Sequence, residues 1–114
     1  MEMNLAVRAL GALAQETRLG IFRLLVEAGP TGLAAGEIAA AVGVSPTNLS
    51  FHLKELAHAG LVTSRQDGRF VFYSASYEHM NALLAYLTEN CCARDGCAPC
   101  RPDKSKSATK GVRS

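Results

Sequence analysis

Residues 45–62, SPTNLSFHLKELAHAGLV, carry the strongest local structural signal in this chain of 114 residues. Ser45 is a preferred helix N-cap residue, and Pro46 follows at the first helical position, where no N–H is needed. Gly60 suits the left-handed position just beyond a helix end. The stretch therefore predicts a helix that starts after Ser45 and runs to Ala59.

The residues on both sides of this helix predict a winged helix-turn-helix. A short helix around Ile38–Val42 ends at Gly43, which leaves only a tight turn before the next helix. Downstream, the β-rich runs 61–65 and 69–73 are joined through Gln66-Asp67-Gly68, and Asp-Gly between such runs favours a hairpin. A helix-turn-helix followed directly by a β-hairpin is a winged helix.

Three more helices complete the predicted architecture. Apolar residues recur at helical spacing over Leu5–Leu13, Glu16–Glu27 and Ser76–Cys91. The expected fold class is mainly α with a small β-hairpin, in the order α-α-α-α-β-β-α. We assign residues 1–92 to one DNA-binding and dimerisation domain. Two segments come after it, a cysteine-rich one at 91–100 and a basic tail at 101–114.

Charge is distributed unevenly between the domain and the tail. The formal net charge is +2, yet residues 101–114 alone carry +4, so the first 100 residues carry −2. Overall charge therefore does not by itself indicate a nucleic-acid partner. The tail has no apolar period, which predicts disorder. It serves either as a solubilising terminus or as a weak, salt-sensitive attraction for phosphates.

Targeting signals are not evident in the sequence. Residues 1–14 have neither a cationic start nor a cleavage-type site, and no apolar run approaches the roughly 18 residues of a membrane span. We therefore expect a cytoplasmic protein without a membrane partner. No Ser/His/Asp constellation, phosphate loop or carboxylate pair indicates catalysis, so we expect no enzyme.

The predicted helix at 46–59 separates a core face from a face suited to DNA. On a helical wheel Leu49, Leu53 and Leu56 fall together and must face the core. Side chains opposite and beside them suit base-edge and phosphate contacts in the major groove of double-stranded DNA. The predicted DNA contacts of this helix are Thr47, Asn48, Ser50, Phe51, His52 and Lys54.

Several of these residues suit a particular DNA contact, and most also have an ordinary structural explanation. Asn48 suits bidentate pairing with adenine, and an outward-facing Phe51 suits contact with a thymine methyl group. Thr47, Asn48 and Ser50 equally fit ordinary cap and surface chemistry. His52 is open to a hydrogen bond with nearby backbone, and Lys54 to a role as a solvated surface charge.

Two arginines flank the predicted hairpin turn. Arg65 and Arg69 stand where they could straddle a phosphate or enter the minor groove. The alternative is pairing with Asp67 or with water.

All four cysteines, Cys91, Cys92, Cys97 and Cys100, lie within ten residues. Soft ligands on one short segment can close around a thiophilic ion at little cost in loop-closure entropy. A cytoplasmic setting keeps such cysteines as thiols or metal ligands. The cluster therefore predicts a site that senses or holds something thiophilic.

The stretch at 45–62, the wing at Asp67-Gly68-Arg69 and the segment at 17–25 (TRLGIFRLL) together resemble the ArsR/SmtB metalloregulators. The resemblance covers about residues 5–92. It implies a homodimeric winged-helix repressor of operator DNA, released when a metal or metalloid binds, with no resident cofactor. In that family the first and last helices usually form the dimer interface, which implies interface roles for Leu5, Leu13, Met80, Leu84 and Leu87.

The resemblance also implies an inducer site. The sequence lacks cysteines at 33–45, where one arsenic site of the family lies, and has only Glu78 and His79 toward the zinc site of the last helix. Cys91-Cys92 followed by Cys97 is similar to the subgroup whose arsenite site is a C-terminal cysteine pair plus one more cysteine. Arsenite and antimonite take three thiolates in a pyramid, so As(III) or Sb(III) is the expected inducer. Cys100 is a spare ligand or a substitute for Cys97.

Other roles for the cysteines stay open at this point. Four thiolates suit tetrahedral zinc or cadmium, either as inducer or as a constitutive structural ion. The C-x-x-C at 97–100 permits a thiol-redox switch on the same repressor. Cys91 also lies on the helical stripe of Met80, Leu84 and Leu87, where its sulfur would simply pack in the core.

Overall fold

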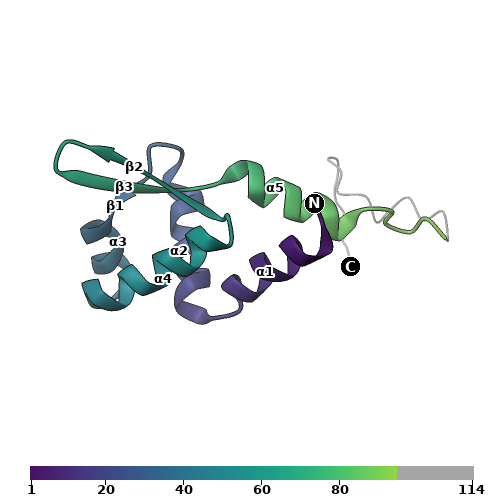
Figure 1. The fold of residues 1–114 in the computed structure, drawn as a ribbon, viewed down its shortest axis with the longest axis horizontal. Helices are drawn as coiled ribbons and strands as arrows, with labels where there is room; N and C mark the ends of the chain where they lie inside the picture. Colours follow the sequence, from purple (N-terminus) through teal and green to yellow (C-terminus); the bar gives the residue numbers. More distant parts are fainter. Residues whose placement is uncertain (95–114) are drawn as a thin grey trace, which may run out of the picture.

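The computed structural model describes residues 1–94, which form five α-helices and a small antiparallel sheet (Figure 1). The predicted order of helices and hairpin strands is confirmed, and one short strand is added before α3. The elements are α1 (Met3–Leu13), α2 (Glu16–Ala28), β1 (Leu33–Ala34), α3 (Ala35–Val42), α4 (Pro46–His58), β2 (Val62–Asp67), β3 (Phe70–Ala75) and α5 (Tyr77–Thr88).

The helix α4 begins where its sequence predicts and ends at His58, one residue before the predicted Ala59. The Ser45 hydroxyl accepts a hydrogen bond from the Asn48 backbone N–H at 3.2 Å, and Pro46 is the first helical residue. At the other end Gly60 adopts a φ of 82°. An L-residue with a side chain rarely adopts that conformation, so Gly60 lets the chain turn directly into β2.

One apolar core joins the helices to the base of the sheet. The three predicted leucines of α4 are all buried in it. Burying a leucine side chain contributes about 1.5–3 kcal/mol, so this stripe alone strongly fixes the rotation of α4 about its axis. The buried members are Ala6, Ala9, Ile21, Phe22, Leu25, Ile38, Leu49, Leu53, Leu56, Ala59, Leu61, Val62, Ala75 and Leu83.

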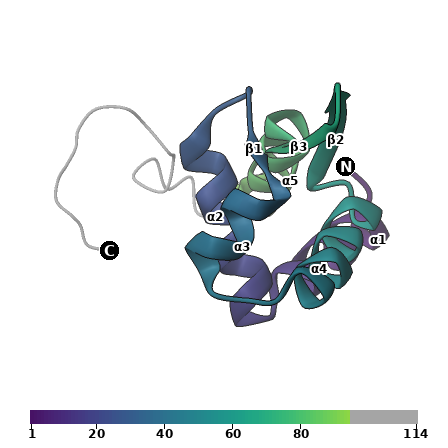
Figure 2. The ribbon, with the colours of Figure 1, turned by 90° about the vertical axis from the view of Figure 1, so that its left-hand side faces the viewer.

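The sheet has the strand order β1-β3-β2, with all pairs antiparallel. Its hairpin turns at Gly68-Arg69, because Asp67 pairs with Phe70 across the two strands. The predicted second strand therefore starts one residue later than expected, and Arg69 lies in the turn. The hairpin projects from the helices as a wing, and Figure 2 shows it beside α3 and α4 at one end of the molecule.

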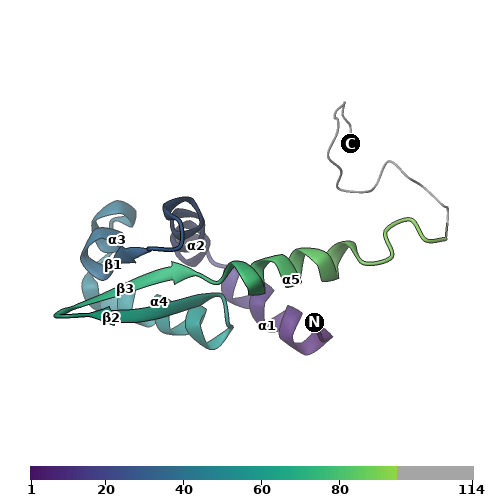
Figure 3. The same ribbon diagram turned by 90° about the horizontal axis from the view of Figure 1, so that it is seen from above.

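At the opposite end, α1 and α5 lie side by side (Figures 1 and 3). The helix α1 turns its alanines, Ala6 and Ala9, into the core and leaves larger apolar side chains outside. Met3 is 68% exposed and Val7 61% exposed in the single chain. The small inward residues let α1 approach the core closely while its apolar outer stripe stays uncovered.

The last helix is shorter than its sequence predicts. It ends at Thr88 rather than at Cys91, because Glu89 is extended and Asn90 takes a φ of 61°. Asn tolerates the left-handed conformation better than most residues do, so it allows this break. Cys91 is therefore off the helical stripe and exposed. The alternative that it packs in the core of the chain is wrong.

Two glycines provide a matched test of this fold. Gly32 has a φ of 78°, and an added Cβ would run into the backbone carbonyl of Tyr73. We expect Gly32→Ala to lower the free energy of unfolding by more than about 2 kcal/mol. Gly20 lies in α2 with nothing within 4 Å of an added Cβ. Gly20→Ala should therefore raise stability by about 0.5–1 kcal/mol.

Urea unfolding at one fixed protein concentration measures both changes. Equal stabilities for the Gly32→Ala variant and the unmodified protein would contradict the packing of β1 against β3.

Candidate DNA-binding interface and C-terminal cysteines

The outward face of α4 presents most of the side chains predicted to contact DNA. Five of the six are exposed, and His52 is half-buried. The buried leucine stripe on the other side of the helix is what turns them outward. The exposed five are Thr47, Asn48, Ser50, Phe51 and Lys54.

Phe51 is an exposed aromatic residue in the middle of this face. Its ring is 57% exposed, and it meets the His52 ring edge-on with 5.8 Å between centroids. An aromatic ring left in water on a polar face gains by contacting an apolar group of a ligand. This exposure fits the predicted contact with a thymine methyl group.

His52 is held by an arginine from another helix. Arg18 Nη1 lies 3.4 Å from His52 Nδ1, and Arg18 Nε donates to the Ala12 carbonyl oxygen at 2.6 Å. A guanidinium only donates, so His52 Nδ1 is the acceptor in this contact. The partner is a side chain 34 residues away rather than nearby backbone. The sequence gives Arg18 no predicted role in DNA binding. The one indication of its importance is that it lies in segment 17–25, which resembles the ArsR/SmtB family.

The wing arginines differ in how firmly they are held. Arg65 Nη2 donates to the Thr31 carbonyl oxygen at 3.0 Å, and Arg65 Nη1 lies 3.8 Å from Asp67 Oδ2. Its guanidinium also stands over the Phe72 ring, 4.9 Å from the centroid. Arg65 thus braces the wing against the loop before β1, whereas Arg69 is exposed in the turn.

The helix α4 and the wing lie at the same end of the molecule, as Figures 1 and 2 show. A helix and a β-ribbon side by side can engage a major groove and its flanking backbone together.

The cysteine pair lies beyond the other end, just past α5. Cys91 is exposed, Cys92 is half-buried, and their sulfur atoms are 3.8 Å apart. The Cys91 N–H donates to the Thr88 carbonyl oxygen at 3.0 Å, which ties the pair to the helix end. Cys97 and Cys100 fall outside the described residues, as does the predicted tail. Within residues 1–94 no group of three or more His, Cys, Asp or Glu side chains is placed to hold a metal ion.

The lengths of the helices bear on whether the chain could cross a membrane. Within residues 1–94, no helix is both long and apolar enough to span a bilayer.

Comparison with known proteins identifies the family. The helix-turn-helix domain family matches residues 13–65. An ArsR-like transcriptional regulator from Rhodococcus sp. RHA1 is 30% identical, with a TM-score of 0.67 over 80% of this chain and 82% of that one. The chain belongs to the ArsR family of transcriptional regulators. These are DNA-binding regulators rather than enzymes, in agreement with the sequence-based expectation.

Two other solved structures are informative. A possible transcriptional regulator for arsenical resistance is 33% identical, with a TM-score of 0.61 over 69% of this chain and 79% of that one. A winged helix-turn-helix domain from Mycobacterium bovis, a possible ArsR-family regulator described as homodimeric, is 28% identical. Its TM-score is 0.62 over 83% of this chain and 88% of that one.

The predicted role of Phe51 can be tested on a duplex selected by the protein from a randomised pool. Replacing each thymine by deoxyuridine removes one methyl group. At the contacted position we expect the affinity of the unmodified protein to fall about 4-fold, since one buried methyl contributes about 0.8 kcal/mol. The Phe51→Ala variant should bind thymine and deoxyuridine duplexes equally in fluorescence anisotropy.

Phe70, an exposed aromatic on the wing, supplies the matched control. Phe70→Ala should keep the sensitivity to deoxyuridine. Undiminished sensitivity in Phe51→Ala would refute the contact.

Proposed function

We propose that this chain is a homodimeric repressor that binds operator DNA and leaves it when As(III) or Sb(III) binds Cys91, Cys92 and Cys97. The observation that carries the proposal is the position of Cys91 and Cys92. Two adjacent sulfur atoms 3.8 Å apart follow directly on α5, whose outer surface is apolar.

The uncovered apolar surface of α1 and α5 supports the dimer. Leu84 is 54% exposed and Leu87 53% exposed, while Leu5 and Leu10 are also exposed on α1. Contiguous apolar surface of this kind on a small domain usually marks a protein interface. Met80 and Leu13 are half-buried at its inner margin. The homodimeric relative from Mycobacterium bovis supports the same assembly.

The chemistry of the cysteines supports the inducer. Thiolates are soft ligands that favour soft, thiophilic centres over hard ions. Cys91 and Cys92 offer two sulfurs from one turn, and Cys97 supplies the third position of a pyramidal site. Cys100 remains a substitute for Cys97. The arsenical-resistance relative supports an arsenic-related role.

Release follows from the placement of the site relative to the dimer helices. Closing three sulfurs around one atom constrains the loop that begins where α5 ends, and so changes the packing of α5 in the dimer. Recognition helices must reach half-sites about 34–36 Å apart, so a small rotation of one protomer breaks their register. A coupling free energy of about 1–3 kcal/mol lowers operator affinity roughly 5–150-fold.

Charge in the apolar surface should break the dimer. Burying an unpaired carboxylate in an interface is strongly unfavourable, so we expect Leu87→Glu to be monomeric in sedimentation equilibrium at micromolar concentration. Its operator affinity should fall at least about 100-fold, because two linked half-sites are replaced by one. Leu19→Glu, at another exposed leucine position, on α2, should remain dimeric. A dimeric Leu87→Glu variant would show that the interface lies elsewhere.

Removing one thiol should separate induction from DNA binding. We expect Cys91→Ser and Cys92→Ser to bind the operator with unchanged affinity but to stay bound when arsenite or antimonite is added. Fluorescence anisotropy of a labelled operator, under reducing conditions, follows both properties. Zinc and cadmium titrations on the unmodified protein test the alternative metal inducers.

The remaining outcomes discriminate among the other roles. Loss of DNA binding in either serine variant would make the cysteines structural, and zinc in the purified protein would point to a constitutive ion. Release by an oxidant, with indifference to arsenite, would assign the thiols to a redox switch.

A further inference from the structure

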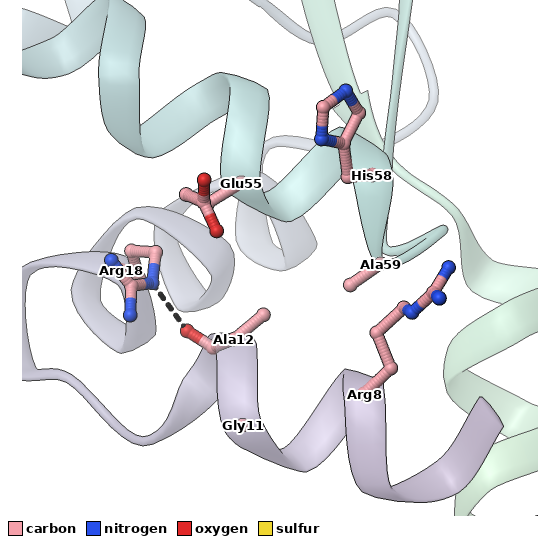
Figure 4. A pocket seen from close by; sticks show the side chains of 7 residues that line it. All are labelled: Arg8, Gly11, Ala12, Arg18, Glu55, His58 and Ala59. Atoms are coloured by element: carbon pink, nitrogen blue, oxygen red, sulfur yellow. Dashed lines mark hydrogen bonds between the residues drawn. The ribbon is translucent and has the colours of Figure 1, made fainter. Parts of the chain in front are cut away.

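A pocket of about 530 Å³ opens between α1 and α4, with α2 at one side (Figure 4). Small residues leave the space open, because Gly11 has no side chain and Ala12 and Ala59 have only methyl groups. An added Cβ at Gly11 would meet nothing within 4 Å. The lining residues are Arg8, Gly11, Ala12, Arg18, Glu55, His58 and Ala59.

Two guanidinium groups give this pocket its chemical character. Arg8 is exposed, and within residues 1–94 its side chain has no hydrogen-bond or salt-bridge partner. Arg18 is oriented by its bond to the Ala12 carbonyl oxygen. Glu55 contributes one opposing charge, so the lining is net positive even with His58 neutral. The two guanidinium groups come from opposite sides of the pocket (Figure 4), and the uncommitted one, on Arg8, suits an anion with acceptor oxygens.

The pocket borders the surface that faces DNA. Glu55 and His58 belong to the same outward side of α4 as Thr47 and Phe51, one to three turns further along the helix. A duplex whose major groove receives α4 therefore brings one of its backbones toward the pocket mouth. Half to two-thirds of protein–DNA hydrogen bonds go to phosphates and sugars, so a net positive pocket at this place matches a backbone group.

We propose that Arg8, at the mouth of this pocket, binds one phosphate group of the operator backbone, with Arg18 on the opposite side adding to the positive potential of the pocket. The inference rests on DNA binding as proposed above, and it is independent of the response to metalloids. It gives α1 a second role. Arg8 and Ala12 lie about 150° around the helix from Met3, Val7 and Leu10, so one helix carries both a phosphate contact and the apolar outer stripe.

The phosphate contact has a distinctive salt signature. Each neutralised phosphate contributes about 0.9 to the slope of log affinity against log salt concentration. A dimer has two copies of the pocket, so Arg8→Gln should reduce that slope by about 1.8. The affinity deficit of the variant should accordingly shrink about 12-fold between 50 and 200 mM salt. Discrimination among operator sequences should not change, because a phosphate carries no base identity.

Two further variants separate a specific phosphate contact of Arg8 from a general effect of charge. Arg23→Gln removes the same charge from α2 at an exposed position about 140° around the helix from Arg18, and it should leave the slope unchanged. Glu55→Gln removes the opposing carboxylate and should tighten binding, the reverse of Arg8→Gln. Sedimentation equilibrium checks that all three variants remain dimers.

Several results would overturn the proposal. Equal slopes for Arg8→Gln, Arg23→Gln and the unmodified protein would show that no phosphate sits in the pocket. An unchanged slope for Arg8→Gln, with inorganic phosphate shifting the Ala12 and Ala59 amide resonances of the DNA-free protein, would assign the pocket to a free anion instead. Failure of the unmodified protein to bind any selected duplex would refute the proposed function itself rather than this site.

Discussion

The burial of Leu49, Leu53 and Leu56 is the constraint on which the rest of the structure depends. These side chains fix the rotation of α4, so the residues between them are forced outward at one end of the molecule. The same leucines belong to a core that includes residues from α1, α2, α3 and α5 and from the base of the wing. The position of the residues predicted to contact DNA is thus set by packing shared with the helices that carry the outer apolar surface.

The small residues of α1 let this helix pack closely on the core while its larger apolar side chains stay on the outside. Ala6 and Ala9 fit against the core, which leaves Met3, Val7 and Leu10 as an outer stripe beside α5. Arg18 then connects the end of α1 to the flank of α4 through the Ala12 carbonyl oxygen and His52 Nδ1. These two contacts connect α1 to the flank of α4, so a movement of α1 would be felt at α4. The proposed inducer site lies at the end of α5, the helix that lies beside α1.

Much of this fold could be predicted from sequence because its signals are local. The cap at Ser45-Pro46, the left-handed Gly60 and the leucine period of α4 each depend on a few neighbouring residues. The strand β1 could not be predicted, since two residues carry no alternating pattern and pair only with the distant Phe72 and Tyr73. The early end of α5 depends on the conformations of Glu89 and Asn90, which the apolar period does not reveal.

For the candidate site too, the local features could be predicted from sequence and the long-range contacts could not. Side chains on one helix face, such as Asn48 and Phe51, follow from periodicity alone and are exposed as expected. Contacts between residues far apart in the sequence do not follow from periodicity. The contact of Arg18 with His52 and the hydrogen bond from Arg65 to the Thr31 carbonyl oxygen were therefore not predicted. The cysteine pair was evident from its clustering, whereas its exposure depended on where α5 stops.

In the proposed mechanism, metalloid binding beyond α5 changes the separation of the two recognition helices. Electron–electron double resonance between spin labels on an unnatural ketone residue at position 54, one in each protomer, measures that separation without using the cysteines. Without metalloid, we expect a distance distribution centred near the 34–36 Å of one DNA turn, to within about the length of the labels. Stoichiometric arsenite should shift that distribution by several Å, on the order of a helix displacement at a subunit interface. A distribution unchanged by arsenite at concentrations that release DNA would show that the two recognition helices do not move apart or together on induction.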